Sequence, residues 1–133
     1  MSQAVLIQRL QAQRESWCEL EPAADGQPAK RVRLRRPVET EISEMRSQPG
    51  KSMLQVITES VCRYAVGWEG ITEADLLGPA QGSSDAVPFS PELWVEVVRD
   101  RMEWVDAAGA HLMQQVAEHL ERKASAAKNL MPS

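Results

Sequence analysis

The sequence has no long hydrophobic run, and this excludes proteins that cross a membrane through a helix. Its apolar stretches are only a few residues long, whereas a membrane-spanning helix needs about 20 predominantly apolar residues. The first ten residues also lack the basic start and long apolar centre of a signal peptide. We therefore predict a cytoplasmic protein without a membrane partner, in which Cys18 and Cys62 remain free thiols.

The chain also lacks the short motifs that mark common active sites. It contains no G-x-S-x-G, H-E-x-x-H or CxxC pattern and no glycine-rich phosphate loop. His111 and His119 lie eight residues apart on one expected helix, too far for both to hold the same metal ion. Cys62 lies in an apolar helical pattern, where a free cysteine behaves as a small hydrophobic residue. We therefore expect a protein that is not an enzyme and that holds no metal or cofactor.

Aromatic residues are scarce, and most of them lie in one stretch. Three of the four tryptophans and the only phenylalanine lie between residues 66 and 104, and each such side chain buries about 150–250 Å². Glycines on both sides of Trp68 predict a helix that ends there in a tight turn. Trp68 continues the apolar stripe of that helix, so we expect it in the core. Trp94 and Trp104 have two interpretations, as core residues or as half-exposed anchors on a protein-binding surface.

One strand pattern is clear, and it predicts a β-hairpin. Residues 30–36 alternate strictly between basic residues and the apolar pair Val32 and Leu34, which is the period of a half-buried strand. A shorter strand is expected at residues 17–20, and the segment between the two contains the proline and glycine typical of turns. Because an isolated hairpin is only marginally stable, we expect it to pack against helices.

Apolar residues spaced by three and four positions predict that most of the remaining chain is helical. The expected helices cover residues 2–14, 38–47, 51–65, 91–99 and about 100–128. Ser90 followed by Pro91 is typical of a helix start. The length of 133 residues suits one domain. The sequence thus predicts an α+β fold, a mainly α-helical single domain 1–133 with one small β-hairpin, a loose N-terminal helix within residues 1–15 and a frayed tail at 129–133.

The basic strand raises the question of nucleic acid. Five of the fifteen basic residues lie within residues 30–36, and phosphate binding requires such a patch. Nucleic-acid-binding proteins usually interleave stacking aromatic residues or present a reading helix, and neither accompanies this strand. A charged outer face also protects an edge strand from aggregation. We expect Arg31, Arg33 and Arg35 to form a solvated face, with nucleic acid or an acidic protein as the alternative partner.

Three short patterns resemble those of one family of phage proteins. They are V-x-L-R-R-P-x-x-x-E from Val32 to Glu41, W-x-G-I from Trp68 to Ile71, and V-P-F-S-x-E from Val87 to Glu92. Together they lie within residues 30–105, more than half of the chain. They resemble the tail assembly chaperones, small tail-module proteins of siphovirus-type phages and prophages.

This resemblance implies a non-enzymatic phage tail assembly chaperone in the cytoplasm of the bacterial host cell. Its partners would be the tape-measure protein, which is very long and helical, and the tail-tube protein that assembles around it. An apolar groove between helices can accept such a partner helix through side chains spaced by one turn. One alternative is a structural tail or head-completion protein retained in the virion. The other is a small nucleic-acid-binding regulator that uses the basic strand.

The length of the last expected helix suggests where a partner binds. A helix of about 28 residues spans about 42 Å, more than a domain with a radius of gyration of about 14 Å needs to cover its core. Surplus apolar surface can bind a partner, or a second copy of the chain in a homo-oligomer. The partner-binding candidates are the apolar residues that we expect the helices to leave exposed: Trp94, Val98, Trp104, Leu112 and Val116.

Overall fold

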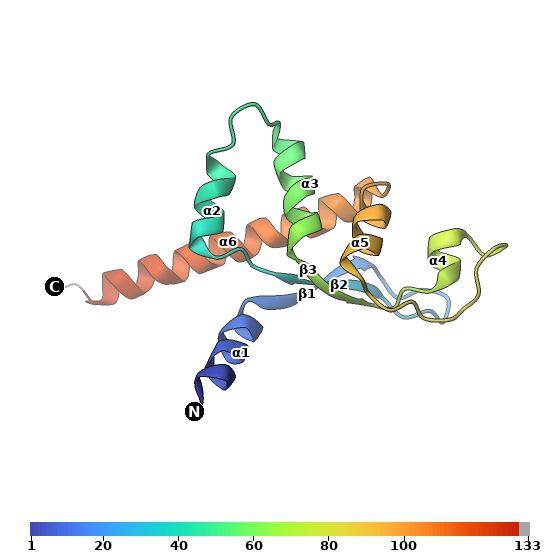
Figure 1. Ribbon diagram of the computed structural model, residues 1–133, viewed down its shortest axis with the longest axis horizontal. Helices are drawn as coiled ribbons and strands as arrows, with labels where there is room; N and C mark the ends of the chain where they lie inside the picture. The colour runs from blue at the N-terminus through green and yellow to red at the C-terminus, as the bar shows by residue number, and fades with distance from the viewer. Residues whose placement is uncertain (131–133) are drawn as a thin grey trace.

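The computed structural model describes residues 1–130 and shows a small antiparallel sheet against a layer of helices (Figure 1). The strands are β1 (Glu15–Glu21), β2 (Lys30–Arg35) and β3 (Ala65–Glu69), in that order across the sheet. The helices are α1 (Gln3–Gln13), α2 (Glu39–Arg46), α3 (Met53–Tyr64), α4 (Glu73–Leu77), α5 (Pro91–Val98) and α6 (Met102–Leu130). The predicted α+β fold with mainly helical structure is confirmed. No helix within residues 1–130 is long and apolar enough to cross a membrane.

The sheet is larger than predicted, so the prediction of one small hairpin is wrong. β1 and β2 form the expected pair, with Cys18 opposite Val32, and β3 adds Trp68 on the other side of Val32. We predicted a helix ending in a turn at Trp68, but α3 stops at Tyr64 and the chain continues directly as β3. Tyr64, Ala65 and Trp68 fit a helical stripe in the sequence. In the fold, Ala65 and Trp68 pair with the free edge of β2, and the extended segment satisfies the backbone hydrogen bonds of that edge.

The chain leaves β3 through a residue that has to be glycine. Gly70 has φ of 77°, and a Cβ atom at this position would collide with the carbonyl oxygen of Ala29. Glycine alone adopts this conformation without steric cost. The turn at Gly70 therefore sets the direction in which the chain continues from the sheet toward α4.

The structure has the predicted start of α5 and the predicted N-terminal helix, and it corrects part of the predicted C-terminal tail. The Ser90 hydroxyl accepts a hydrogen bond from the Leu93 amide at 3.1 Å, and Pro91 occupies the first turn of α5. α1 forms where the N-terminal helix was expected, but none of its residues is buried. Of the predicted frayed tail, Asn129 and Leu130 are helical, and residues 131–133 lie outside the described part of the chain.

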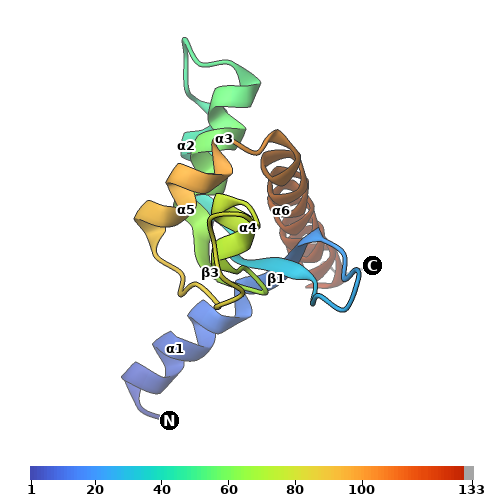
Figure 2. The same cartoon turned by 90° about the vertical axis from the view of Figure 1, so that its right-hand side faces the viewer.

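The core lies between one face of the sheet and three helices. α3, α5 and α6 cover the same face, and α1 extends away on the other side (Figure 2). The buried residues of this core are Cys18, Leu20, Val32, Leu34 and Ala65 from the sheet, Ile71 after it, and Val61, Tyr64, Val98, Val105, Ala108 and Leu112 from the helices, together with three tryptophans. Alternation of buried and exposed positions along β1 and β2 places the apolar set on this face.

Three tryptophans and a phenylalanine form a continuous aromatic row in the core. The Phe89 and Trp68 ring centroids lie 5.6 Å apart with an interplanar angle of 83°. Trp68 meets Trp94 at 6.4 Å and 73°, and Trp94 stacks on Trp104 at 6.3 Å and 15°. These are the edge-to-face and stacked arrangements that aromatic pairs prefer. The row connects β3, α5 and α6.

Each indole N–H of the row donates to an oxygen of a different segment. The bonds are Trp68 to Val87 O at 2.6 Å, Trp94 to Val61 O at 3.0 Å, and Trp104 to Glu21 Oε2 at 3.0 Å. A buried N–H without an acceptor would cost about 1–3 kcal/mol, so these bonds fix where the indoles can lie. Trp94 and Trp104 are therefore core residues, which decides between their two interpretations.

A second set of contacts joins β2, α2 and α3 through Glu41. Its carboxylate accepts two hydrogen bonds from Arg35, at 2.7 and 3.1 Å, and a third from the Val38 amide at 2.9 Å. Arg63 of α3 lies 3.0 Å from the same carboxylate. The bonds from Arg35 lower the pKa of Glu41, although burial opposes them.

Replacing Trp68 should strongly destabilise the fold. Trp68→Ala removes a largely buried ring and its contacts with Phe89 and Trp94, so we expect a loss of about 3–5 kcal/mol in the free energy of unfolding. Trp17→Ala is the matched control, since Trp17 is 38% exposed. Urea unfolding measures both. Equal midpoints for the two variants would contradict the assigned core.

Replacing Glu41 should give a pH-dependent loss of stability. We expect Glu41→Gln to lower the free energy of unfolding at pH 7 by about 2–3 kcal/mol, because the amide lacks the negative charge and one of the two acceptor oxygens that Arg35 and Arg63 contact. The folded pKa of Glu41 lies below its ordinary value of 4.5, so its stabilisation is complete above that pH. It is lost as pH falls through the folded pKa. Urea melts of parent and variant should therefore converge in acid, and a constant difference down to pH 2 would contradict this role.

Candidate protein-binding grooves

Four of the five predicted partner-binding residues are buried, so their prediction as surface anchors is wrong. Trp94, Val98 and Trp104 are 0% exposed and Leu112 is 1% exposed. The apolar stripes of α5 and α6 face the sheet, and the four buried residues pack against it. Val116, further along α6, is only partly buried and lines an open groove.

α6 does extend beyond the core, but the part that extends is polar. The helix extends past the rest of the molecule toward its C-terminal end (Figure 1). Residues 121–130 are all exposed, and their sequence is mostly charged and small residues. The expectation that this surplus offers an apolar stripe is therefore wrong, because the stripe ends near Leu120.

The basic strand is balanced by acidic neighbours. Arg31 forms an ion pair with Glu69, and Arg33 Nε lies 3.5 Å from Glu15. Arg35 is bound to Glu41 as described above. The face that carries Arg31 and Arg33 is therefore close to neutral, whereas phosphate binding needs uncompensated positive charge.

Sequence reasoning missed an aromatic residue beside these arginines. The guanidinium groups of Arg31 and Arg33 each lie 5.7 Å from the centroid of the Trp17 ring. Trp17 pairs with Arg33 across β1 and β2, so the statement that no aromatic accompanies the basic strand is wrong. Only the register of the hairpin, which cannot be read from residues 30–36 alone, could have shown this contact.

An open groove between α2, α3 and α6 is lined by methionines; we call it the methionine groove. It encloses about 470 Å³. Its apolar lining is Ile42, Met45, Met53, Val56, Met113 and Val116, and its polar lining is Arg46, Gln48 and Lys51. Met53 is 74% exposed and Met113 is 38% exposed. Methionine side chains are flexible and polarisable, and such surfaces adapt to varied apolar partners.

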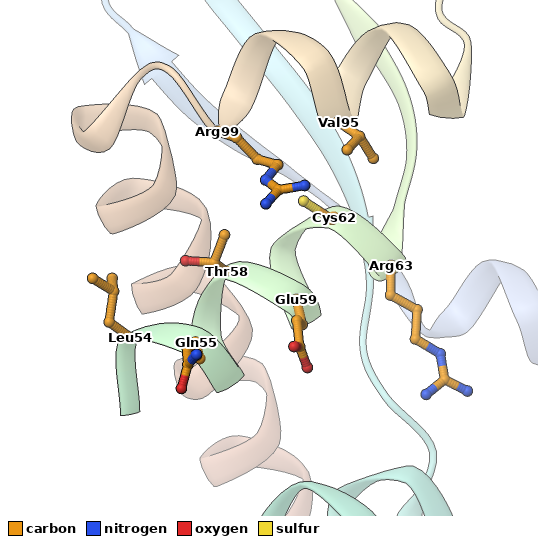
Figure 3. Close-up of a pocket in the computed structure, with 8 residues that line it drawn as sticks. All are labelled: Leu54, Gln55, Thr58, Glu59, Cys62, Arg63, Val95 and Arg99. Atoms are coloured by element: carbon orange, nitrogen blue, oxygen red, sulfur yellow. The ribbon is translucent and has the colours of Figure 1, made fainter. Parts of the chain in front are cut away.

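A second groove lies between α3 and α5; we call it the α3–α5 groove (Figure 3). It encloses about 620 Å³. Leu54, Thr58 and Cys62 line it from one side of α3, and Val95 and Arg99 line it from α5. More than half of its lining residues are polar or charged, whereas six of the nine lining residues of the methionine groove are apolar.

The two cysteines differ in access. Cys18 is 5% exposed in the core, and burial raises its pKa to about 11 with a smaller contribution from Glu19. Cys62 is half-buried at the wall of the α3–α5 groove. Burial raises its pKa too, but the positive charge of Arg99 acts in the opposite direction. Cys62 is therefore the thiol that a reagent in solution can reach.

The two histidines serve separate contacts between elements. His111 Nε2 lies 2.7 Å from Ser16 Oγ and joins α6 to β1. His119 Nε2 lies 3.0 Å from Glu39 Oε2 and joins α6 to α2. Within residues 1–130, no three side chains of the metal-ligating types come together. Neither histidine lines the methionine groove or the α3–α5 groove.

Thiol labelling should distinguish the two cysteines. We expect one fast and one slow phase when the folded protein reacts with an aromatic disulfide at pH 8, because thiolate content and access set the rate. Cys62→Ser should remove the fast phase, and Cys18→Ser should remove the slow one. A fast phase that persists in Cys62→Ser would contradict the assigned exposures.

Comparisons with known proteins add no relative to this description. No protein-family model matches the chain, and no curated protein or solved structure matches it. The resemblance to phage tail assembly chaperones therefore remains a prediction from residues 30–105.

Proposed function

We propose that this protein is a non-enzymatic binding protein that holds an amphipathic helix of another protein in the methionine groove. One observation carries the proposal: methionines from three helices, Met45, Met53 and Met113, line one open apolar hollow. Met53 leaves most of its apolar side chain in water, and the burial of such surface favours the binding of a partner. An apolar groove lined by several helices can accept an amphipathic helix that inserts side chains spaced by one turn.

The groove also indicates the charge of its occupant. Arg46 and Lys51 are the charged residues of its lining, and Lys51 lies 2.8 Å from Glu59 of α3. Because Glu59 balances Lys51, a helix with an apolar stripe and an acidic residue opposite Arg46 would complement this rim, since opposite charges at an interface set orientation and partner choice. The methionines supply adaptable apolar contact with little demand for one sequence.

We propose further that the partner is a tape-measure protein and that the protein acts as a phage tail assembly chaperone. The support is the resemblance of residues 30–105 to that family, together with an adaptable groove. A very long helical protein presents many different apolar stripes before it is assembled. A methionine-lined surface can cover such stripes in turn, which prevents their aggregation until tail-tube protein surrounds them.

Coexpression with fragments of the accompanying tape-measure protein tests the proposal. We expect the parent chain to keep at least one fragment soluble, and Met53→Ser combined with Met113→Ser to lose this effect. Full burial of one methionine is worth about 1.5–3 kcal/mol, and 1.4 kcal/mol is a tenfold change in affinity. We therefore expect at least tenfold weaker binding of the soluble fragment, measured by calorimetry.

Leu54→Ser is the matched control. Leu54 follows Met53 in α3 and is 50% exposed, but it lines the α3–α5 groove. The Leu54→Ser variant should bind the fragment as tightly as the parent does, and labelling of Cys62 should stay fast in the complex. Loss of binding in Leu54→Ser, with protection of Cys62, would place the partner in the wrong groove for this proposal. Failure to solubilise any fragment, with stoichiometric protein in purified virions, would overturn the chaperone role.

A further inference from the structure

α1 exposes an apolar face that no other segment within residues 1–130 covers. Val5, Leu6, Ile7 and Leu10 are 40–54% exposed, and α1 extends away from the rest of the molecule in both views (Figures 1 and 2). Leu6, Ile7 and Leu10 share one side of the helix, because residues three and four positions apart are neighbours. The helix is formed and capped, since Ser2 Oγ accepts a hydrogen bond from the Val5 amide at 3.2 Å.

The charged side chains of α1 and of the residue that follows it are all positive. They belong to Arg9 and Arg14, and the sequence has no acidic residue before Glu15. Arg9 follows Leu6 by three residues, so it lies beside the apolar face. A surface that receives α1 should therefore be apolar with an acidic rim.

A third groove, between α4 and α5, has this character; we call it the α4–α5 groove. It encloses about 440 Å³. Its apolar lining is Leu76, Leu77, Val87, Leu93 and Val97, and its acidic lining is Glu73, Glu96 and Asp100. Leu77 is 61% exposed. Acidic residues thus border an apolar floor from both helices.

The one basic residue of this lining is held by its own chain. Arg101 Nη2 donates to the Asp75 carbonyl oxygen at 2.8 Å, and its guanidinium lies 4.8 Å from the centroid of the Trp104 ring. These contacts fix Arg101 against α4 and the aromatic row. The three carboxylates outnumber this one guanidinium, so the lining carries a net negative charge.

The α1 of the same chain cannot reach this groove while the sheet is intact. α1 joins β1 at Glu15, which pairs with Arg35 at one end of β2. α4 lies at the other end, where Lys30 Nζ is 3.4 Å from Asp75. A strand of this length separates the two ends by about 20 Å, and only Arg14 stands between α1 and β1.

We propose that α1 of one copy docks in the α4–α5 groove of a second copy of this chain. Leu6, Ile7 and Leu10 contact the apolar floor, and Arg9 faces Glu96 and Asp100. One short helix covers less area than the roughly 1,600 Å² of a standard stable interface. The association is therefore reversible and concentration-dependent, and it weakens with salt. It uses a different groove from the proposed partner helix and does not rest on that function.

Sedimentation velocity of the full chain tests this association by charge exchange. The apparent mass of the parent should rise above the monomer mass of 14.8 kDa as the protein concentration increases. Arg9→Glu and Glu96→Arg should each weaken association at least tenfold when studied alone, because each sets like charges against one another. An equimolar mixture of the two variants should associate again, since Glu at position 9 then meets Arg at position 96.

Two uncharged variants test the apolar part of the same contact. Leu77→Ser should reduce association and Leu54→Ser, in the α3–α5 groove, should leave it unchanged. Circular dichroism of each variant should match the parent, because all four replaced side chains are exposed. A monomeric parent at every concentration would overturn the proposal. So would an oligomer unaffected by Arg9→Glu and Leu77→Ser, or a mixture of the charge variants that stays monomeric.

Discussion

The three buried indoles determine how the helices lie on the sheet. Each ring needs both an apolar surrounding and an acceptor for its N–H, and an unpaired group would cost about 1–3 kcal/mol. The acceptors come from β1, from α3 and from the loop before α5, at Glu21, Val61 and Val87. Trp94 and Trp104 can reach theirs only when α5 and α6 cross the same face of the sheet. The aromatic row therefore sets the position of the whole helical layer on the sheet. This role is additional to the apolar area that its rings bury.

This arrangement also explains where the grooves occur. The sides of α5 and α6 that carry Trp94, Val98, Trp104 and Leu112 are committed to the core. The flanks of α3 and α5 consequently face outward, and each borders a hollow lined by partly exposed apolar residues. Binding surfaces in this fold lie between helices and beside the core residues. They are not formed by the strongest apolar anchors of the sequence.

Local patterns predicted what depends on neighbours in sequence. The alternation in β2 and the Ser90–Pro91 start of α5 were both recognised, because strand period and helix caps are local properties. β3 was not predicted, because its five residues fit the spacing of a helix as well as the alternation of a strand. Its extended form depends on pairing with the free edge of β2. The buried state of Trp94 and Trp104, and the position of Trp17 beside two arginines, depend on register and on distant acceptors. The grooves could not be predicted, because each is formed by residues from two or three separate helices.

The exchange of the four indole N–H protons with deuterium tests the aromatic row most directly. Hydrogen-bonded groups in a core exchange through large unfolding events, while exposed groups exchange quickly. The signals of Trp68, Trp94 and Trp104 should persist together in nuclear magnetic resonance spectra, whereas that of Trp17, which Trp17→Phe identifies, should vanish first. If the Trp94 or Trp104 signal is lost as fast as that of Trp17, those indoles lie at the surface and this account of the core is wrong.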